Sequence, residues 1–266
     1  MIDRGKHSVL GVNISAVDYQ RAVANIIEAA EEGVPFSCSA LAVHGVMTGA
    51  QDAEHLYRLN GLDMAVPDGQ PVRWALRVLH GVNLPDRVYG PRLMLETCAE
   101  AERKGLPIYL FGSSPAVLGA LSENLTHRFP ELKIAGQSAS RFRTLSAEEA
   151  EDLVETIHSS RAALVFAGLG CPRQEVWAYE FTPRLGLPVI AIGAAFDFHA
   201  GNKATAPAWM QRIGLEWLFR LFEEPRRLWK RYLLLNPAFL ARLAIQRIFP
   251  SREIASRRPT TEVLYG

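Results

Sequence analysis

Several features that would define other classes of protein are missing from this sequence of 266 residues. Its only cysteines, Cys38, Cys98 and Cys171, are far apart and form neither a CxxC pair nor a Cys/His cluster. The spacing excludes a disulfide framework and gives no support for a zinc site, so a reducing compartment fits best.

Long hydrophobic runs are also missing. The longest, 187–196, is well short of the ~20 residues that span a bilayer, and the N-terminus lacks the apolar stretch of a signal peptide. The formal net charge of +1 argues neither for nor against nucleic acid when averaged over the chain; we expect no nucleic-acid partner. What is present, 48% hydrophobic and 21% charged residues, fits a globular domain with a sizeable core.

Short β-branched runs alternate with helical patterns over the first two hundred residues. The expected strands are 9–14, 36–43, 62–66, 108–111, 132–136, 163–167 and 189–193. The expected helices are 17–31, 46–59, 71–79, 92–104, 116–128, 147–160 and 172–182. Pro115 and Pro172 suit a first helical turn, and Ser146 with Glu149 suits a capping box. This alternation predicts an α/β fold, a Rossmann-like and mostly parallel sheet flanked by helices, which binds ligands at the carboxyl ends of its strands.

The pattern changes near residue 206, after which no strand is expected. Helices are predicted over 208–224, 225–235 and 237–249, the last with Asn236 as its N-cap. We therefore divide the chain into a core (1–206), a basic amphipathic helical appendage (207–250) and a flexible tail (251–266).

The appendage mixes basic and apolar residues. Between Arg212 and Arg247 the sequence has eight basic and three acidic residues, interleaved with aromatic and aliphatic side chains. Such a pattern suits a helix lying in an anionic lipid headgroup layer, with Arg226, Arg227, Lys230 and Arg231 as the expected contacts. It fits equally well a docked helical pair with ion pairs such as Glu216/Arg220.

Three turns between a strand and a helix are candidates for chemistry. Asp68 is either a general base at the mouth of the sheet or the cap of the helix that starts near Pro71. The small-residue turn at Gly112 suits a diphosphate. The turn 168–175 starts as GxG but has Arg173 where a dinucleotide fingerprint has its third glycine, which leaves only a weak case for a Rossmann oxidoreductase.

Other polar residues near these turns leave alternatives open. Gln174 either hydrogen-bonds a sugar or base or faces solvent, and Asp197 is either a buried structural carboxylate or a catalytic one. His44 and His199 have no metal-ligand spacing. No Asp-x-Asp occurs, the pattern with which many sugar-nucleotide enzymes hold a divalent cation, so we expect no metal and no cofactor.

At these turns the sequence resembles the WecG/TagA/CpsF family, glycosyltransferase family 26. The resemblance covers roughly residues 9–232 and rests on motifs that match in order. They are Pro67-Asp68-Gly69, Arg87-Val88-x-Gly90-Pro91, Leu110-Phe111-Gly112, Gly168-x-Gly170-x-Pro172-x-Gln174-Glu175, Gly193-x-x-Phe196-Asp197, Ala206-Pro207-x-Trp209, Gly214-Leu215-Glu216-Trp217-Leu218-x-Arg220-Leu221 and Glu224-Pro225-x-Arg227-Leu228.

The resemblance implies a metal-independent, inverting glycosyltransferase with a GT-E-like arrangement of core and appendage. Its donor would be UDP-N-acetylmannosamine, the corresponding uronic acid or UDP-glucose. Its acceptor would be a polyprenyl-diphosphate-linked sugar in cell-envelope or exopolysaccharide synthesis. The enzyme would be cytoplasmic and peripheral on the inner face of the cell membrane, while its oligomeric state is left undefined.

The resemblance also implies roles for particular residues. Asp68 would be the catalytic base, and Arg87 and Arg220 would neutralise the diphosphate. The remaining expected substrate-binding residues are Gly69, Gly112, Gly168, Gly170, Pro172 and Gln174.

Four positions depart from the family pattern. Ala40 and Ala42 replace a Thr-x-Asn pair, Arg92 replaces Asp, and Thr205 replaces Arg. Ser37, Ser39 and His44 are candidates for the polar contacts that the alanines lack. A catalytically silent relative that binds lipid-linked sugar or partner enzymes is therefore an alternative to the active transferase.

Overall fold

The computed structural model describes residues 1–250 and 254–266, and the side chains of Ala208, Arg227, Lys230 and Arg231 lie outside that description. Its strands form a six-stranded sheet of order β4-β3-β8-β7-β5-β6, parallel throughout, and a separate β1-β2 hairpin. The strands are β1 (Asp3–Val9), β2 (Val12–Val17), β3 (Phe36–Leu41), β4 (Met64–Pro67), β5 (Ile108–Gly112), β6 (Ile134–Ser138), β7 (Leu164–Gly168) and β8 (Pro188–Ala191). The predicted Rossmann-like α/β class is confirmed.

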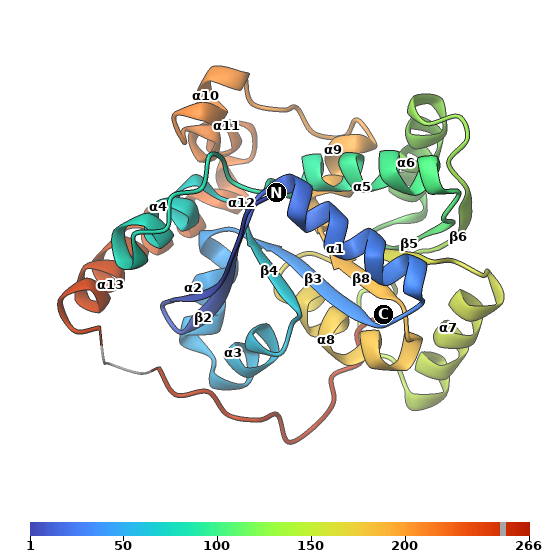
Figure 1. Cartoon of the computed structure of the whole chain (residues 1–266), viewed down its shortest axis with the longest axis horizontal. Coiled ribbons are helices and arrows are strands. Elements are labelled where there is room, and N and C mark those ends of the chain that lie inside the picture. Colours follow the sequence, from blue (N-terminus) through green and yellow to red (C-terminus); the bar gives the residue numbers. More distant parts are fainter. Residues whose placement is uncertain (251–253) are drawn as a thin grey trace.

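Helices cover both faces of the sheet (Figure 1). In the core they are α1 (Tyr19–Glu32), α2 (Val43–Gln51), α3 (Ala53–Asn60), α4 (Gln70–His80), α5 (Gly90–Lys104), α6 (Pro115–Arg128), α7 (Ala147–Ser159), α8 (Arg173–Leu185) and α9 (Gly193–His199). The appendage holds α10 (Ala208–Arg212), α11 (Glu216–Glu223), α12 (Pro225–Lys230), a π-helical turn η1 (Arg231–Leu235) and α13 (Asn236–Ile248).

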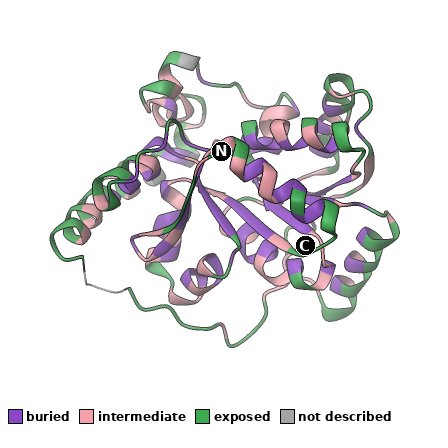
Figure 2. Ribbon diagram, in the orientation of Figure 1, coloured by how far each residue is buried: buried purple, intermediate pink, exposed green. Residues whose placement is uncertain are grey.

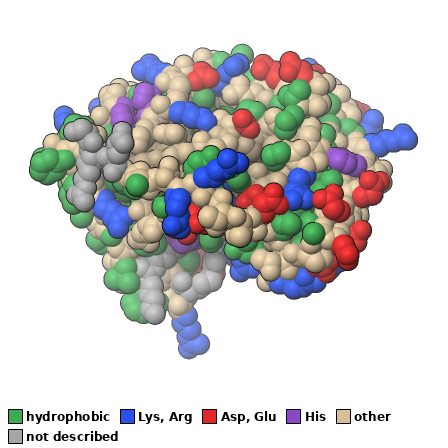
Figure 3. Space-filling view, turned by 90° about the horizontal axis from the view of Figure 1, so that it is seen from below, with side chains coloured by type: hydrophobic (Ala, Val, Ile, Leu, Met, Phe, Trp, Pro, Cys, Tyr) green, Lys and Arg blue, Asp and Glu red, His purple; other side chains and the backbone are tan. Residues whose placement is uncertain are grey.

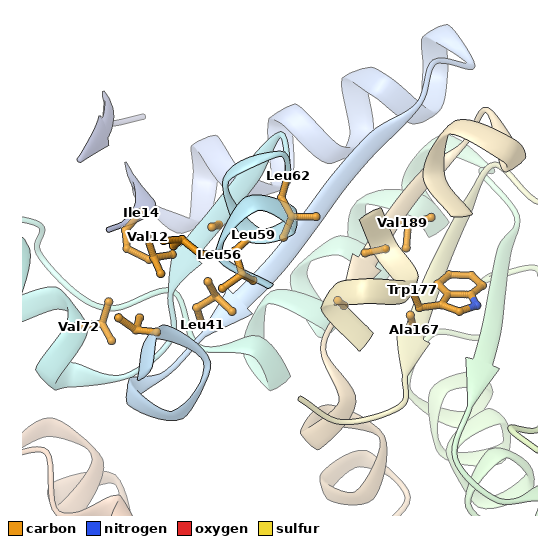
Figure 4. Close-up of a cluster of buried hydrophobic side chains, with 14 of the residues drawn as sticks. Val12, Ile14, Leu41, Leu56, Leu59, Leu62, Val72, Ala167, Trp177 and Val189 are labelled. Carbon is orange, nitrogen blue, oxygen red and sulfur yellow. The ribbon is translucent and has the colours of Figure 1, made fainter. Parts of the chain in front are cut away.

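The strands are buried on both faces because alternate side chains enter two different hydrophobic clusters. In β7, Val165 and Ala167 join the cluster under α2, α3 and α8, whereas Leu164 and Phe166 join the cluster under α1, α5 and α6. Figure 4 shows the first cluster, in which Trp177 lies against the sheet. Figure 2 shows the same distribution, with the central strands buried and the outer turns of α4 and α13 exposed.

Several expected elements differ in their details. The first expected strand, 9–14, is wrong because Leu10 and Gly11 form a hairpin turn with φ of 52° and 85°. Leucine rarely adopts this left-handed conformation, so the turn gave no sequence signal. The expected helix 46–59 is two helices, since the side chain of Asp52 caps α3 by accepting from Glu54 N and His55 N.

The second half of the chain shows further differences. Helix α9, which includes Asp197, lies where no helix was expected, and the expected helix 208–224 is broken at Gly214. Asn236 is not an N-cap, because η1 continues directly into α13 with Leu235 in helical conformation. Pro172 is the N-cap of α8 rather than its first helical residue. The Ser146/Glu149 capping box and the first-turn position of Pro115 are confirmed.

The expected flexible tail lies along the core over its described residues, 254–266 (Figure 1). Arg257 N donates to Ala53 O at 2.9 Å, and the buried Arg58 guanidinium donates to Thr261 O at 3.1 Å. Near its end the segment forms a bridge between Tyr265 and Thr144. The sequence predicted a flexible tail because this segment is polar and aperiodic. Its contacts with the core could not be foreseen, since they are mostly backbone hydrogen bonds, which leave no pattern in the side chains.

Candidate active site

Three adjoining cavities lie at the carboxyl ends of the parallel strands. The sheet-edge cavity, about 320 Å³, runs from Asp68 past the turn 168–170 to Phe142. The appendage cavity, about 100 Å³, lies between Asp68 and the helices α11 to α13. The arginine cavity, about 550 Å³, adjoins the appendage cavity at Arg87. Asp68 lines both of the first two cavities, so it lies where they meet.

Asp68 is held by the backbone of two neighbouring segments. Its N–H continues the parallel ladder to Leu41 O at 3.1 Å, and its Oδ1 accepts from Gly90 N, at the start of α5, at 2.9 Å. Asp68 therefore contacts the start of α5, and the alternative that it caps the helix near Pro71 is wrong: Gly69 occupies that N-cap position.

Burial raises the pKa of Asp68 to about 6, although the charges of Arg87 and Arg220 and the hydrogen bond from Gly90 act in the opposite direction. A carboxylate with this pKa is largely ionised at neutral pH, yet binds a proton more readily than an ordinary aspartate. These are the properties of a general base.

Arg87 connects the core to the appendage. Its guanidinium lies 4.3 Å from the centre of the Tyr89 ring and donates to Glu216 at the start of α11, and both charged side chains are nearly buried. Burial opposes the charge of Arg87, but the carboxylates of Glu216 and Asp68 raise its pKa, so Arg87 stays cationic beside the aspartate. The expected Glu216/Arg220 pair is not what forms; Glu216 binds Arg87 instead.

Arg220 projects from the appendage to the same point. It lines the sheet-edge and appendage cavities, and its guanidinium lies 5.5 Å from the centre of the Phe198 ring. Lys203 also lines the sheet-edge cavity, where it pairs with Asp197 at 2.9 Å and with Glu224 of the appendage at 3.4 Å. Asp197 is therefore an ion-paired residue of the cavity wall.

Gln174 supports two glycine turns from beneath. Its Oε1 accepts from Gly193 N at 2.8 Å and from Gly170 N at 3.1 Å, while its Nε2 donates to Glu175 Oε1 at 2.8 Å. Both polar atoms of the buried Gln174 amide are thus used within the protein, so the solvent-facing alternative is wrong. Gln174 also lines the sheet-edge cavity, where its contact with a sugar or base stays a prediction. Its contacts shape the cavity floor.

Glu175 lies beneath the same floor and was not among the expected site residues. Burial raises the pKa of its carboxyl group, whose Oε1 also accepts from Ser39 Oγ at 3.1 Å. The hydrophobic residues around it in the sequence gave no indication that this glutamate points inward, because a glutamate early in a helix ordinarily faces solvent.

The structure places the expected glycines at different parts of the site. Gly168 and Gly170 line the sheet-edge cavity, and Gly69 lines the appendage cavity. Gly112 lies behind them: a Cβ at this position would lie 2.7 Å from the Gly168 carbonyl, so a glycine is needed where the two turns approach. Neither Gly112 nor Pro172 lines a cavity that contains Asp68.

The four departures from the family pattern all line these cavities. Ala40 and Ala42 lie in the wall beside Asp68, and Arg92 and Thr205 lie in the arginine cavity. Ser37 and Ser39 do not compensate for the alanines, since their hydroxyls bind Asp63 and Glu175. His44 lines the appendage cavity, whereas His199 contacts Pro91 O at 2.8 Å.

Several charged residues of the site were missed in the sequence, among them Glu175 and Lys203. Glu216 stands inside a motif but was taken for an intrahelical partner, and Arg128, at the end of α6, was not considered. Only the fold brings Arg128 to the arginine cavity with Arg87, Arg92 and Arg212. In the part of the chain that the structure describes, His, Cys, Asp and Glu form no group that could hold a metal ion.

The appendage exposes many apolar side chains. Among its described residues, the large ones are Trp209, Ile213, Phe222, Trp229, Leu233, Leu234, Leu240, Ile245, Ile248 and Phe249. Figure 3 shows hydrophobic side chains at the surface on the left, the side on which α13 lies in Figure 1. Arg226 is exposed, while the side chains of Arg227, Lys230 and Arg231 lie outside the described residues. No helix, over the residues described, has the length and apolar character needed to cross a bilayer.

Comparison with known proteins defines the class. A curated relative from Bacillus subtilis (strain 168), N-acetylglucosaminyldiphosphoundecaprenol N-acetyl-beta-D-mannosaminyltransferase, is 31% identical over 186 residues, which is 69% of each chain. The profile of the glycosyl transferase WecG/TagA/CpsF family matches residues 7–253. The protein is thus a glycosyltransferase. It belongs to the WecG/TagA/CpsF family, which confirms the resemblance drawn from its motifs.

Proposed function

We propose that this enzyme transfers a sugar, with inversion and without a metal ion, from a UDP-sugar to a polyprenyl-diphosphate-linked acceptor. The observation that carries the proposal is the position of Asp68, a half-buried carboxylate of raised pKa where two cavities meet. The name of the Bacillus relative supports an N-acetylmannosamine donor and a diphospholipid acceptor. The same name supports a role in building a cell-envelope polysaccharide.

The proposed reaction is a single in-line displacement. The acceptor hydroxyl oxygen attacks the anomeric carbon, the bond from that carbon to the diphosphate oxygen breaks, and UDP leaves with the bonding electron pair. Asp68 takes the hydroxyl proton, which requires its carboxylate within about 3 Å of that oxygen in the bound complex. One displacement inverts the configuration of the anomeric carbon.

Cationic side chains of the chain would stabilise the leaving diphosphate. Arg220 and Lys203 line the sheet-edge cavity, and Arg87 adds its charge beside Asp68. Fixed positive groups in a cavity shielded from water stabilise developing negative charge without reorganisation. This is the support for a reaction that needs no metal ion.

The arginine cavity suits the acceptor. It adjoins the appendage cavity, which Asp68 lines, at Arg87, Tyr89 and Pro91, and Arg92 and Arg128 also line it. Guanidinium groups bind phosphate oxygens in pairs, as a lipid diphosphate requires. Arg128→Gln is expected to raise the KM for acceptor about tenfold and leave the KM for donor unchanged, which initial-rate measurements with each substrate varied would show.

The exposed apolar and basic residues of the appendage support peripheral binding at the inner face of the cell membrane. An amphipathic surface of this kind gains free energy both from apolar burial and from attraction to anionic lipids. A membrane-bound acceptor would then meet the appendage cavity from the side of α11 to α13.

A second candidate is a catalytically silent relative that binds lipid-linked sugar or partner enzymes. It is favoured by Ala40 and Ala42, which give the cavity wall beside Asp68 two methyl groups in place of polar side chains. The active transferase and the silent relative would both bind lipid-linked sugar, but only the transferase would turn it over.

The decisive experiment incubates the enzyme with each of a set of UDP-sugars and a short-chain lipid-linked acceptor, with release of UDP as the readout. Burst-free, acceptor-dependent release of UDP, with product of inverted anomeric configuration by NMR, is the expected result. A UDP-sugar that raises Tm by mass action without any release of UDP would instead identify the silent relative.

A further inference from the structure

Phe142 differs from the other exposed apolar residues in its position. Its ring belongs to the turn between β6 and α7 and is 56% exposed. Of the large exposed hydrophobic side chains among the described residues, Phe142 alone lines a cavity that contains Asp68. Most of the others belong to the appendage.

The backbone of Phe142 is strained. Its φ is 55°, in the left-handed region that a bulky side chain seldom adopts. Only Leu10, Ser113 and Arg161 share this property among the non-glycine residues described, and Ser113 lines the same sheet-edge cavity. Strain of this kind persists where the surrounding structure imposes it, and it is concentrated at ligand sites.

Hydrogen bonds impose this conformation from two sides. Phe142 N donates to Ser140 Oγ at 2.9 Å, and Ser140 N donates to Ser113 O at 3.0 Å. On the other side Leu145 N donates to Leu264 O at 2.7 Å, so the C-terminal segment pairs with the same turn. The backbone that carries the Phe142 ring is therefore held in position before any ligand binds.

The order of the strands sets the direction of the cavity. Asp68 follows β4 at one edge of the sheet, Phe142 follows β6 at the other, and the 168–170 turn follows β7 between them. Five steps of ~4.8 Å separate the ends of β4 and β6, roughly 24 Å, and the turns that follow these two strands converge on one cavity, which both Asp68 and Phe142 line. A nucleotide sugar that places its anomeric carbon at Asp68 extends along this row with its base toward Phe142.

We infer that the ring of Phe142 stacks on the nucleobase of the donor, an assignment that rests on the proposed nucleotide-sugar transfer. A fixed aromatic face on the wall of a nucleotide cavity offers a base its preferred offset-stacked contact. The strain in the turn is then the consequence of holding an apolar ring where a base, rather than the protein, covers it.

The test measures binding of UDP and of inorganic pyrophosphate to the full chain by isothermal titration calorimetry. Phe142→Ala is expected to weaken UDP binding roughly 5- to 100-fold, the usual effect of removing one base–aromatic stack, and to leave pyrophosphate binding unchanged. Phe142→Trp retains a stacking face and should bind UDP within about threefold of the wild type.

A second variant separates stacking from folding. Asparagine tolerates the left-handed region, so Phe142→Asn should keep or raise Tm while it weakens UDP binding as much as Phe142→Ala does. Equal UDP affinity in wild type, Phe142→Ala and Phe142→Asn would overturn the stacking assignment alone. Absence of UDP binding in the wild type would overturn the proposed donor class and the assignment with it.

Discussion

The core and the appendage of this enzyme use their apolar residues in opposite ways. In the core, alternate side chains of each parallel strand enter two clusters that helices cover completely. In the described appendage, Leu228, Tyr232 and Phe239 are buried, while ten large apolar side chains are exposed. The core therefore has its own hydrophobic driving force for folding, whereas the appendage buries few large apolar side chains and leaves most of them exposed.

The contrast teaches that both regions build the cavities at Asp68, whereas the appendage contributes most of the exposed apolar surface. The core supplies Asp68 and the sheet-edge cavity, and the appendage supplies Arg220, Glu216 and the exposed apolar surface. One side of the appendage helices packs on the core and the other remains exposed, and contact with a lipid surface stays a prediction.

Substitution of the base is expected to have the largest effect. Asp68→Asn should reduce kcat by about 10²–10⁴-fold, since the acceptor hydroxyl loses its proton acceptor, while vesicle binding stays unchanged. UDP-release assays and co-sedimentation measure the two properties. Asp152 of α7 is exposed, and Asp152→Asn is the control. Near-normal turnover in Asp68→Asn would remove Asp68 from the mechanism.

Neutralising basic residues of the appendage should weaken vesicle binding and leave UDP binding unchanged. Replacing Arg226, Arg227, Lys230 and Arg231 together by glutamine is expected to weaken binding to anionic vesicles roughly 10²-fold, and UDP affinity should not change. Co-sedimentation across a salt series measures this, because salt screens the attraction between basic side chains and anionic lipids over ~8–10 Å.

A matched set on the core provides the control for that experiment. Arg103, Lys104, Lys133 and Arg161 are exposed, and their replacement by glutamine changes net charge equally. If both sets weaken vesicle binding to the same degree, the appendage has no special role at the membrane.

The link between the two regions is the buried pair of Arg87 and Glu216. Glu216→Gln should destabilise docking of the appendage by ~3 kcal/mol, because the nearly buried Arg87 charge loses its partner. Limited proteolysis within 208–250, together with urea unfolding, reports the change. Glu100→Gln, which breaks the exposed pair with Arg103, should cost below about 1 kcal/mol; equal effects would mean that the pair does not join the regions.

The pH dependence should locate the core's contribution to catalysis. With a pKa of about 6 for Asp68, kcat/KM is expected to fall about tenfold per pH unit below pH ~6. Stability changes in the opposite sense: the folded state binds this proton more tightly than the unfolded state, so the wild type loses stability as pH rises from ~4 to ~6. The Tm of Asp68→Asn relative to wild type should therefore increase over that range, and a constant difference would argue against a raised pKa.

The smallest effect is expected from chelation. EDTA should leave UDP release unchanged, since Arg87, Arg220 and Lys203 are proposed to stabilise the diphosphate. Loss of activity that Mg²⁺ or Mn²⁺ restores would contradict this scheme.

Much of the core could be predicted from local signals. The alternating strands and helices, the Ser146/Glu149 capping box and the position of Asp68 after a strand all follow from residues near one another in the sequence. The missed turn at Leu10 and the missed boundary between α2 and α3 at Asp52 show where prediction from local signals fails. Each depends on one residue whose conformation is set by packing around it.

The sequence by itself determined the fold class, the family and the carboxylate that ends β4, since strand periodicity and short motifs are local properties. Only the tertiary structure decided which partners these residues have: Glu216 with Arg87 rather than Arg220, Gln174 beneath two glycine turns, and Phe142 at the far end of the cavity. These contacts join segments far apart in the chain, and their geometry depends on the order of the strands, which no local pattern contains.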